Sequence, residues 1–215
     1  MEVVTAHNNN LKRDPITLVI LKREITKEII VAFSGTQSLL ELLDEFTQAL
    51  PTDYELHPND NGAKVIGFFY NHYKEDFKDY LRDHVDKLID ENPDYSIVCT
   101  GHSLGGALAV HAAADLVLSE FSRNASVSLY TYGQPRVANK QFFDIFIDKL
   151  EGFNRIVHFS DAVPHLPPCV PSLSGGCVDS GILPFYPYHH PQEIFYDAEF
   201  ENFIECSESE GEDPI

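Results

Sequence analysis

Residues 101–106, with the sequence Gly-His-Ser-Leu-Gly-Gly, constrain the fold more than any other part of the chain. They follow the apolar run 95–100, which predicts a strand, and lead into residues 104–121, whose pattern predicts a helix. A serine flanked by glycines at such a junction is typical of a turn too tight for side chains two positions before and after the serine. The turn lifts the Ser103 hydroxyl out of the sheet, and the helix amides point toward it. Ser103 is therefore the candidate nucleophile, with an incidental serine in a glycine-rich turn as the alternative.

The second half of the chain alternates between strand-like and helix-like segments. The predicted strands are 95–100, 126–132 and 155–160, and the predicted helices between them are 104–121 and 140–150. Apolar strands joined by helices indicate a parallel sheet that is covered by helices on both faces. The predicted fold class is therefore α/β, with a mostly parallel central sheet.

Local sequence patterns also predict a hairpin, two further helices and a last pair of strands. The remaining predicted elements are a hairpin of 16–21 and 28–33, helices over 38–50 and 68–91, and a last strand pair of 194–196 and 200–204. We expect residues 1–206 to form one domain and residues 207–215 to form a disordered acidic tail.

The charge of the chain argues against two classes of partner. There are 15 Lys and Arg residues against 34 Asp and Glu residues, which gives a net charge of −19. Nucleic acids and anionic membrane surfaces are both recognised through clustered basic residues, so neither is an expected partner. No window is long and apolar enough to predict a transmembrane segment.

An acid and several bases lie downstream of the serine. Asp161 follows the predicted strand 155–160, which places it at the carboxyl edge of the sheet, where sites of α/β folds assemble. The candidate bases are His165, His189 and His190, since the order serine, acid, histidine is the one expected after such a turn. His102 adjoins the serine, but a neighbour in a turn generally points elsewhere.

The four cysteines differ in their surroundings. Cys99 lies in an apolar run and is predicted to be a buried free thiol. A disulfide between Cys169 and Cys177 would close a short loop, and Cys206 would then be the remaining cysteine of this region. A zinc site made of these cysteines with His189 or His190 is a weaker alternative, because no Cys-x-x-Cys pair is present.

Together these motifs resemble the class 3, or fungal-type, lipases of the α/β-hydrolase superfamily. The matching segments, in order, are 33–36 (FSGT), 100–106 (TGHSLGG), 132–137 (YGQPRV) and 161–168 (DAVPHLPP). A histidine followed four residues later by a glutamate, as in the family, selects His189 with Glu193. The paired histidines and the nearby cysteines resemble the secreted, nematode-like members more than the fungal ones.

The resemblance assigns roles to individual residues. It implies that Ser103 is the nucleophile, His189 the general base and acid, and Asp161 the carboxylate that orients the imidazole. It also implies that Thr36 and the amide of Leu104 form the oxyanion hole. The residues by themselves point only to Ser103 and Asp161; the selection of His189 and Thr36 rests on the resemblance.

The segment after Thr36 corresponds to the lid of the family. Its leucine-rich sequence suits a flap with an apolar side that meets lipid, while an ordinary helix packed on the sheet is the alternative. The predicted lid residues are Ser38, Leu39, Leu40, Leu42, Leu43 and Phe46.

The expected function is that of a serine carboxylester hydrolase, most specifically an acylglycerol lipase that acts through an acyl-enzyme. The alternatives are a phospholipase A1, an esterase for soluble substrates, and a non-catalytic lipase-like binding or regulatory protein. Chemistry of this kind needs no metal or organic cofactor, so none is expected. The expected partner is an ester substrate, met in solution or at a lipid–water interface.

The start of the chain gives two opposing indications about its location. The resemblance implies a secreted protein, yet the first residues show no signal peptide, which keeps a cytoplasmic location as the alternative. Relatives carry an additional segment before the position of Phe33, so we expect this chain to be a family member shortened at its N-terminus.

Overall fold

The computed structural model describes most of the chain. The described residues are 1–9, 15–35, 51–55, 62–119, 122–169 and 187–206. The predicted helix over 38–50 and the predicted tail over 207–215 lie outside these ranges.

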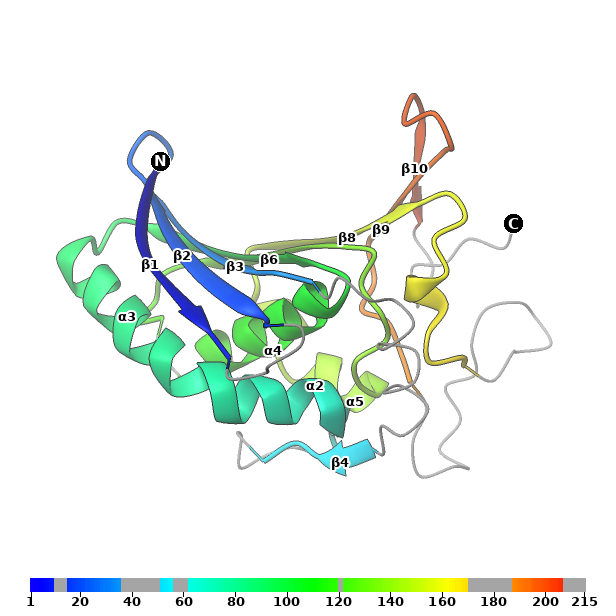
Figure 1. The fold of residues 1–215 in the computed structure, drawn as a ribbon, viewed down its shortest axis with the longest axis horizontal. Helices are drawn as coiled ribbons and strands as arrows, with labels where there is room; N and C mark the ends of the chain where they lie inside the picture. The colour runs from blue at the N-terminus through cyan, green and yellow to red at the C-terminus, as the bar shows by residue number, and fades with distance from the viewer. Residues whose placement is uncertain (10–14, 36–50, 56–61, 120–121, 170–186, 207–215) are drawn as a thin grey trace.

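An eight-stranded sheet runs through the whole molecule (Figure 1). In sheet order its strands are β1 (Glu2–Asn8), β2 (Thr17–Arg23), β3 (Glu28–Phe33), β6 (Ser96–His102), β7 (Val127–Tyr132), β8 (Gly152–His158), β9 (Glu193–Tyr196) and β10 (Phe203–Cys206). The five strands from β3 to β9 are parallel to their neighbours, and the outer pairs β1–β2, β2–β3 and β9–β10 are antiparallel. The predicted mostly parallel α/β sheet is confirmed.

The described helices match the predicted positions with two differences. They are α2 (Gly67–His72), α3 (Lys78–Glu91), α4 (Leu104–Leu118) and α5 (Lys140–Asp144), with short helical turns η1 (Tyr73–Phe77), η2 (Ile147–Lys149) and η3 (Val163–His165). The amphipathic helix predicted over 68–91 is divided by η1, which is a π-helical turn. The helix predicted over 140–150 is broken after Asp144, so that α5 is only five residues long. A small two-stranded sheet of β4 (Pro51–Asp53) and β5 (Lys64–Ile66) was not predicted.

One face of the large sheet is covered more completely than the other. Helices α2, α3, α4 and α5 all lie on the same side of it in Figure 1. Side chains that point to this side are fully buried, as Val31 and Cys99 are, whereas their neighbours Ile30 and Val98 are only partly buried. The described helices therefore lie over this more completely buried face.

A buried carboxylate connects the helical layer. Asp115 of α4 accepts hydrogen bonds from Tyr73 Oη of η1 at 2.7 Å and from Arg82 Nε of α3 at 2.9 Å, and it forms an ion pair with the same guanidinium. The side chain of Asp115 is only 1% exposed. When one partner of a buried ion pair is removed, the charge of the other is left uncompensated. Loss of the contact between Asp115 and Arg82 should therefore strongly destabilise the folded protein.

We expect Asp115→Ala to lower the free energy of unfolding by about 2–3 kcal/mol, because Tyr73 and Arg82 lose their shared acceptor. Chemical denaturation measures this change. Asp83→Ala, which removes an exposed carboxylate from α3, is the matched control and should change stability by less than about 0.5 kcal/mol. Equal effects of the two substitutions would contradict the role given to Asp115.

A second buried polar group on α4 is His111, which is packed among aromatic rings. Tyr70, Tyr73 and Phe142 surround its ring at centroid distances of 5.5 to 6.2 Å. Burial lowers the pKa of His111 to about 3, from its usual 6.5. The imidazole is therefore neutral in the folded protein over the physiological pH range.

Because the unfolded chain binds a proton on His111 near pH 6.5 and the folded chain does so only near pH 3, acid favours unfolding between these values. The contribution of neutral His111 to the free energy of unfolding is complete above pH 6.5 and is lost as the pH falls toward 3. We expect His111→Leu to make the free energy of unfolding less dependent on pH across this interval, as measured by denaturation at a series of pH values. An unchanged pH dependence would contradict the burial of a neutral imidazole.

Candidate active site

Ser103 sits in a strained turn between β6 and α4. Its backbone has φ 55° and ψ −123°, and its amide donates to the carbonyl of Tyr132 at 2.9 Å. A Cβ atom on Gly101 would lie 2.3 Å from the backbone of Gly105, and one on Gly105 would lie 2.3 Å from the carbonyl oxygen of Phe33. Both positions therefore require glycine, which confirms the tight turn predicted from the sequence.

The end of β3 and the start of α4 flank the serine. A Cβ atom on Gly35 would lie 3.5 Å from Ser103 Cβ, so the chain that follows β3 passes directly beside the nucleophile. Leu104 is the first residue of α4, and its amide has no acceptor within the helix because no residue of the helix precedes it. The amide of Leu104 is therefore a donor that the helix leaves available next to Ser103, as its predicted role in the oxyanion hole requires. Thr36, the other predicted donor, lies outside the described residues, as do the lid residues from Ser38 to Phe46.

Asp161 lies at the same edge of the sheet, just after β8. Its amide donates to the carbonyl of His158 at 3.0 Å, and its Oδ1 accepts from the amide of Val163 at 3.0 Å. The other carboxylate oxygen, Oδ2, rests against Gly133, where an added Cβ would be 2.6 Å away. Gly133 follows β7 and has φ 53°. The parallel strands β6, β7 and β8 thus bring Ser103, Gly133 and Asp161 to one edge of the sheet. The sequence predicted this position for Ser103 and Asp161.

Two residues at this edge were not recognised as part of the site from the sequence. Gly133 accommodates the Asp161 carboxylate, and the signal for it is a glycine directly after a buried strand. Arg136 is buried, and it holds the segment after Asp161 in place: its amide donates to the carbonyl of Leu166 at 2.7 Å and its Nη1 to that of Pro167 at 3.2 Å.

His189, the base that the resemblance implies, lies in a buried position beyond Asp161. The side chain has no exposed surface, and its Nε2 bonds to the carbonyl oxygen of Pro164 at 2.7 Å. Since a carbonyl oxygen only accepts hydrogen bonds, Nε2 is the protonated nitrogen in this contact. Between described residues, no hydrogen bond joins His189 to Ser103 or Asp161, so its role as a base stays a prediction.

The glutamate of the His-x-x-x-Glu spacing and the two histidines lie beside a buried arginine. Glu193 forms a buried ion pair with Arg155, with 2.7 Å between Oε2 and Nη1. Burial, together with the positive charges of Arg155 and Arg136, lowers the pKa of His189 well below its usual value. Burial and Arg155 likewise lower the pKa of His190 to about 3. Both imidazoles are neutral groups packed against a buried arginine.

The other histidines near the edge are more exposed. His102 is exposed, and its Nε2 would be 3.3 Å from a Cβ atom on Gly133, on the side of the Asp161 carboxylate. His165 ends the turn η3 and is also exposed. In the described part of the chain, no histidine is hydrogen-bonded to the Ser103 hydroxyl.

The cysteines follow the sequence prediction as far as they are described. Cys99 is a buried free thiol, and burial raises its pKa. Cys169 is disulfide-bonded, while Cys177 lies outside the described residues. Cys206 is also a buried free thiol. Within the described ranges, no group of histidine, cysteine and acidic side chains is arranged to hold a metal ion, and no helix is long and apolar enough to cross a membrane.

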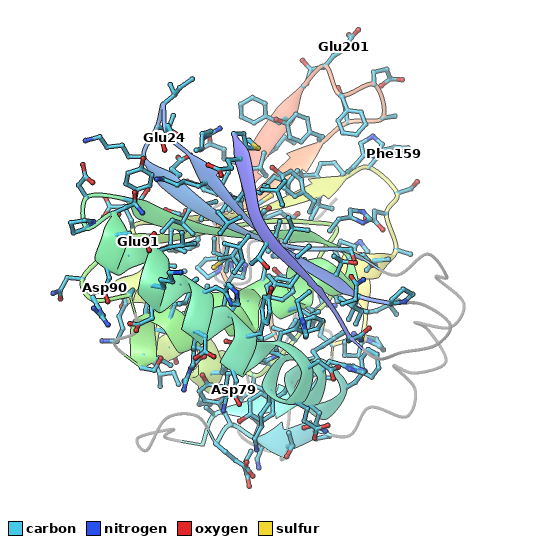
Figure 2. All side chains as sticks on the ribbon, turned by 60° about the vertical axis from the view of Figure 1, so that its left-hand side comes forward. Glu24, Asp79, Asp90, Glu91, Phe159 and Glu201 are labelled. Carbon is cyan, nitrogen blue, oxygen red and sulfur yellow. The ribbon has the colours of Figure 1, made fainter. Side chains whose placement is uncertain are left out.

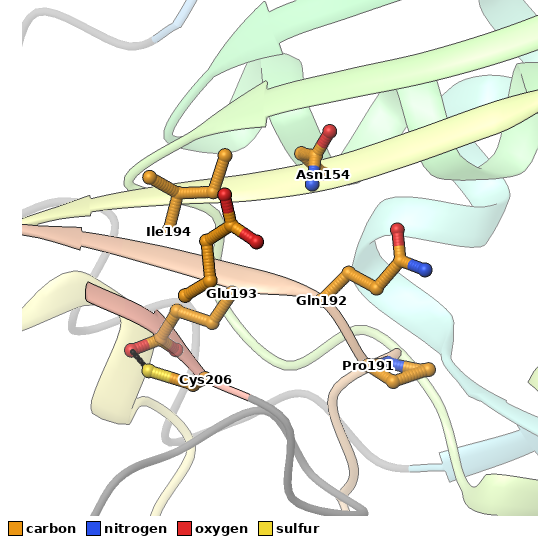
Figure 3. Close-up of a pocket in the computed structure, with 7 residues that line it drawn as sticks. Asn154, Pro191, Gln192, Glu193, Ile194 and Cys206 are labelled. Carbon is orange, nitrogen blue, oxygen red and sulfur yellow. Dashed lines mark hydrogen bonds between the residues drawn. The ribbon is translucent and has the colours of Figure 1, made fainter. Parts of the chain in front are cut away.

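A cavity of about 530 Å³ is lined by residues of β8, β9 and β10 and of the segment before β9 (Figure 3). Asn154, Glu193 and Cys206 are among the residues that line it, and Cys206 Sγ lies 3.8 Å from Glu193 Oε1. The Glu193 carboxylate is already paired with Arg155, and neither Ser103 nor Asp161 lines the cavity. The cavity is therefore separate from the candidate site at the sheet edge.

The contact between Gly133 and Asp161 can be tested with a matched pair of glycines. We expect Gly133→Ala to displace the carboxylate and to slow the reaction of Ser103 with a fluorophosphonate by about 100-fold, since a displacement near 1 Å has an effect of this size. Gly62→Ala is the control, because Gly62 has φ 83° but no atom within 4 Å of an added Cβ. If both variants react at the same rate, the proposed contact is irrelevant to the site.

Comparison with known proteins is consistent with this geometry. A lipase of Caenorhabditis elegans is 31% identical over 192 residues, which are 85% of this chain and 52% of the relative. A lipase of Rhizomucor miehei is 33% identical over 151 residues, 70% of this chain and 40% of the relative. The chain therefore spans about half the length of the curated relatives that it matches.

A solved structure and a family model also match this chain to lipases. The solved structure is that of a triacylglycerol lipase whose catalytic centre is described as a serine protease triad. Its sequence is 27% identical to this chain, and the two structures superpose with a TM-score of 0.75. The match covers 97% of this chain and 71% of the solved chain. The family model for lipase (class 3) matches residues 30–171, which is more than half of the chain. These residues carry the strained Ser103 turn, Gly133 and Asp161, and we conclude that the chain belongs to the class 3 lipase family.

Proposed function

We propose that the protein is a serine carboxylester hydrolase that acts on acylglycerols. The observation that carries the proposal is the position of Ser103: a buried serine held in a strained backbone at the start of α4, with the Asp161 carboxylate at the same sheet edge. Relatives described as lipases support an acylglycerol as the substrate class.

In the proposed reaction the Ser103 oxygen attacks the ester carbonyl, and its proton passes to an imidazole, for which we propose His189. The negative charge on the carbonyl oxygen is stabilised by the amide of Leu104, where each such donor contributes about 3–4 kcal/mol. Collapse of the tetrahedral intermediate releases the alcohol, which takes the proton from the imidazolium, and water then cleaves the acyl-enzyme by the reverse sequence. The carboxylate of Asp161 stabilises the imidazolium in both steps.

The identity of the imidazole is tested separately. His189 is the base that we propose, so His189→Gln is expected to lower the rate of fluorophosphonate labelling of correctly folded protein by about 10⁴-fold or more. In this structure its Nε2 is directed to the carbonyl oxygen of Pro164, so the ring has to change its hydrogen bond before it can serve Ser103. A labelling rate that stays largely unchanged in folded His189→Gln would assign the activation of Ser103 to another imidazole.

A non-catalytic, lipase-like binding protein is the second candidate. The observation that favours it is the absence, among described residues, of a histidine hydrogen-bonded to Ser103. Labelling separates the two candidates, because a fluorophosphonate forms an adduct with Ser103 only if the serine is activated.

Secretion is proposed on chemical grounds. Cys169 is disulfide-bonded, and such bonds persist in oxidising compartments. Expression with and without an added export signal, followed by thiol counting, tests this proposal.

We expect wild-type protein to hydrolyse p-nitrophenyl butyrate and a triglyceride emulsion, and Ser103→Ala to abolish both activities because the nucleophile is gone. A panel of triglyceride, phospholipid and soluble ester then separates a lipase from a phospholipase A1 and from an esterase. Hydrolysis that persists in Ser103→Ala would overturn the proposal, and a wild-type protein that neither hydrolyses nor labels would favour the binding protein.

A further inference from the structure

The hairpin formed by β9 and β10 projects from the body of the protein on the side of the catalytic edge. Strand β9 is parallel to β8, so both reach the edge at their carboxyl ends, where Asp161 follows β8. Residues 197–202, which connect β9 to β10, therefore extend beyond this edge. Figure 1 shows the hairpin standing clear of the sheet, and Figure 2 shows Glu201 at its tip with Phe159 beside its base.

Large apolar side chains gather on this hairpin and remain exposed. Phe200, Phe203 and Ile204 are 61%, 55% and 55% exposed, and Phe159, whose amide donates to the carbonyl of Tyr196, is 52% exposed. Exposed apolar patches of this kind mark surfaces that bind a partner. We call these four residues the aromatic ledge.

The backbone holds two of these rings outward at a conformational cost. Phe159 has φ 38° and Phe200 has φ 58°, values that glycine adopts without strain and phenylalanine rarely does. Asp197 fixes the turn, since its carboxylate accepts from the amides of Glu201 and Asn202 at 2.9 and 3.1 Å. The ring of Phe200 also stacks on His158, with centroids 3.8 Å apart. The turn is therefore built to present the ring.

The charges around the aromatic ledge are negative, which favours a zwitterionic lipid surface over an anionic one. From residue 187 to residue 206 the chain contains no lysine or arginine. The carboxylates of Glu199, Glu201 and Glu205 are exposed, while that of Glu193 is neutralised by Arg155. An anionic membrane would repel this hairpin. Choline headgroups offer a quaternary ammonium, which aromatic faces and carboxylates both attract.

We infer that the aromatic ledge binds the surface of zwitterionic, choline-bearing phospholipid and so sets the catalytic edge against the lipid. The aromatic rings lie at the level of the headgroups, where amphipathic and aromatic side chains are stable, and the exposed carboxylates meet the ammonium groups. The inference deepens the proposed function, on which it rests for its substrate class, but the binding itself requires no turnover.

The absence of tryptophan from the chain makes a direct test simple. Phe200→Trp in a Ser103→Ala background places a single fluorophore on the aromatic ledge of a protein that cannot hydrolyse ester. Its emission should shift to shorter wavelength with phosphatidylcholine vesicles and stay unchanged with phosphatidylglycerol vesicles. Ile25→Trp is the matched control, since Ile25 is 95% exposed between β2 and β3, and its emission should not respond to either vesicle.

Sedimentation with vesicles gives the second measurement. Phe200→Ala combined with Phe203→Ala should lower partitioning onto phosphatidylcholine by at least about tenfold, whereas Ile25→Ala should have no effect. Glu199→Lys with Glu201→Lys should shift binding toward phosphatidylglycerol. Folding of each variant is checked by circular dichroism and thermal unfolding, and the fluorescence experiment does not depend on the alanine variants.

The inference is overturned if phosphatidylcholine causes no shift, if Ile25→Trp shifts equally, or if the unaltered hairpin prefers phosphatidylglycerol. Self-association that Phe203→Ala abolishes, without binding to vesicles, would also overturn it and would assign the aromatic ledge to a second copy of the chain. Fluorophosphonate labelling of wild type reports on Ser103 alone, so the failure of the proposed function and the failure of lipid binding are distinguished.

Discussion

The close approach of α4 to the strands behind it is the constraint on which the site depends. Gly105 comes so near to the carbonyl of Phe33 that no side chain fits between them, and Gly101 meets Gly105 in the same way. These contacts fix the start of α4 against β3 and β6, force the strained backbone at Ser103, and aim the first amides of the helix at its hydroxyl. The positions of the proposed nucleophile and of the proposed oxyanion donor thus follow from one backbone packing.

The sequence predicted the features that arise from local patterns and from the direction of strands. Ser103 was recognised because both glycines are sterically necessary, and Asp161 because a parallel sheet collects strand ends at one edge. Helix 140–150 was predicted whole but breaks after Asp144, since its apolar spacing does not report the turn that tertiary packing imposes. Strand β1 was missed because its side chains are largely exposed and give little apolar alternation.

His189 and Glu193 show what a spacing motif leaves open. The interval between them is that of the family motif, and in the structure the Glu193 carboxylate is paired with Arg155 in a buried position. Nothing in the local sequence indicates that Arg155, thirty-eight positions earlier than Glu193, is its partner. A partner so far away along the chain is set by the parallel pairing of β8 with β9, which only the three-dimensional arrangement shows.

The connection from β3 to β6 has a consequence for how such a protein can diversify. Both ends are fixed, because Phe33, where it begins, lies beside Gly101 and Ser96, where it ends, pairs with Glu28. In addition, Ser34 Oγ accepts from the amide of Thr17 at 2.9 Å. The entropic penalty of lengthening a connection between fixed ends grows only logarithmically with its length. Insertions and deletions between β3 and α2 can therefore accumulate over evolution without moving Ser103, so that substrate preference and the geometry of the nucleophile are free to evolve at different rates.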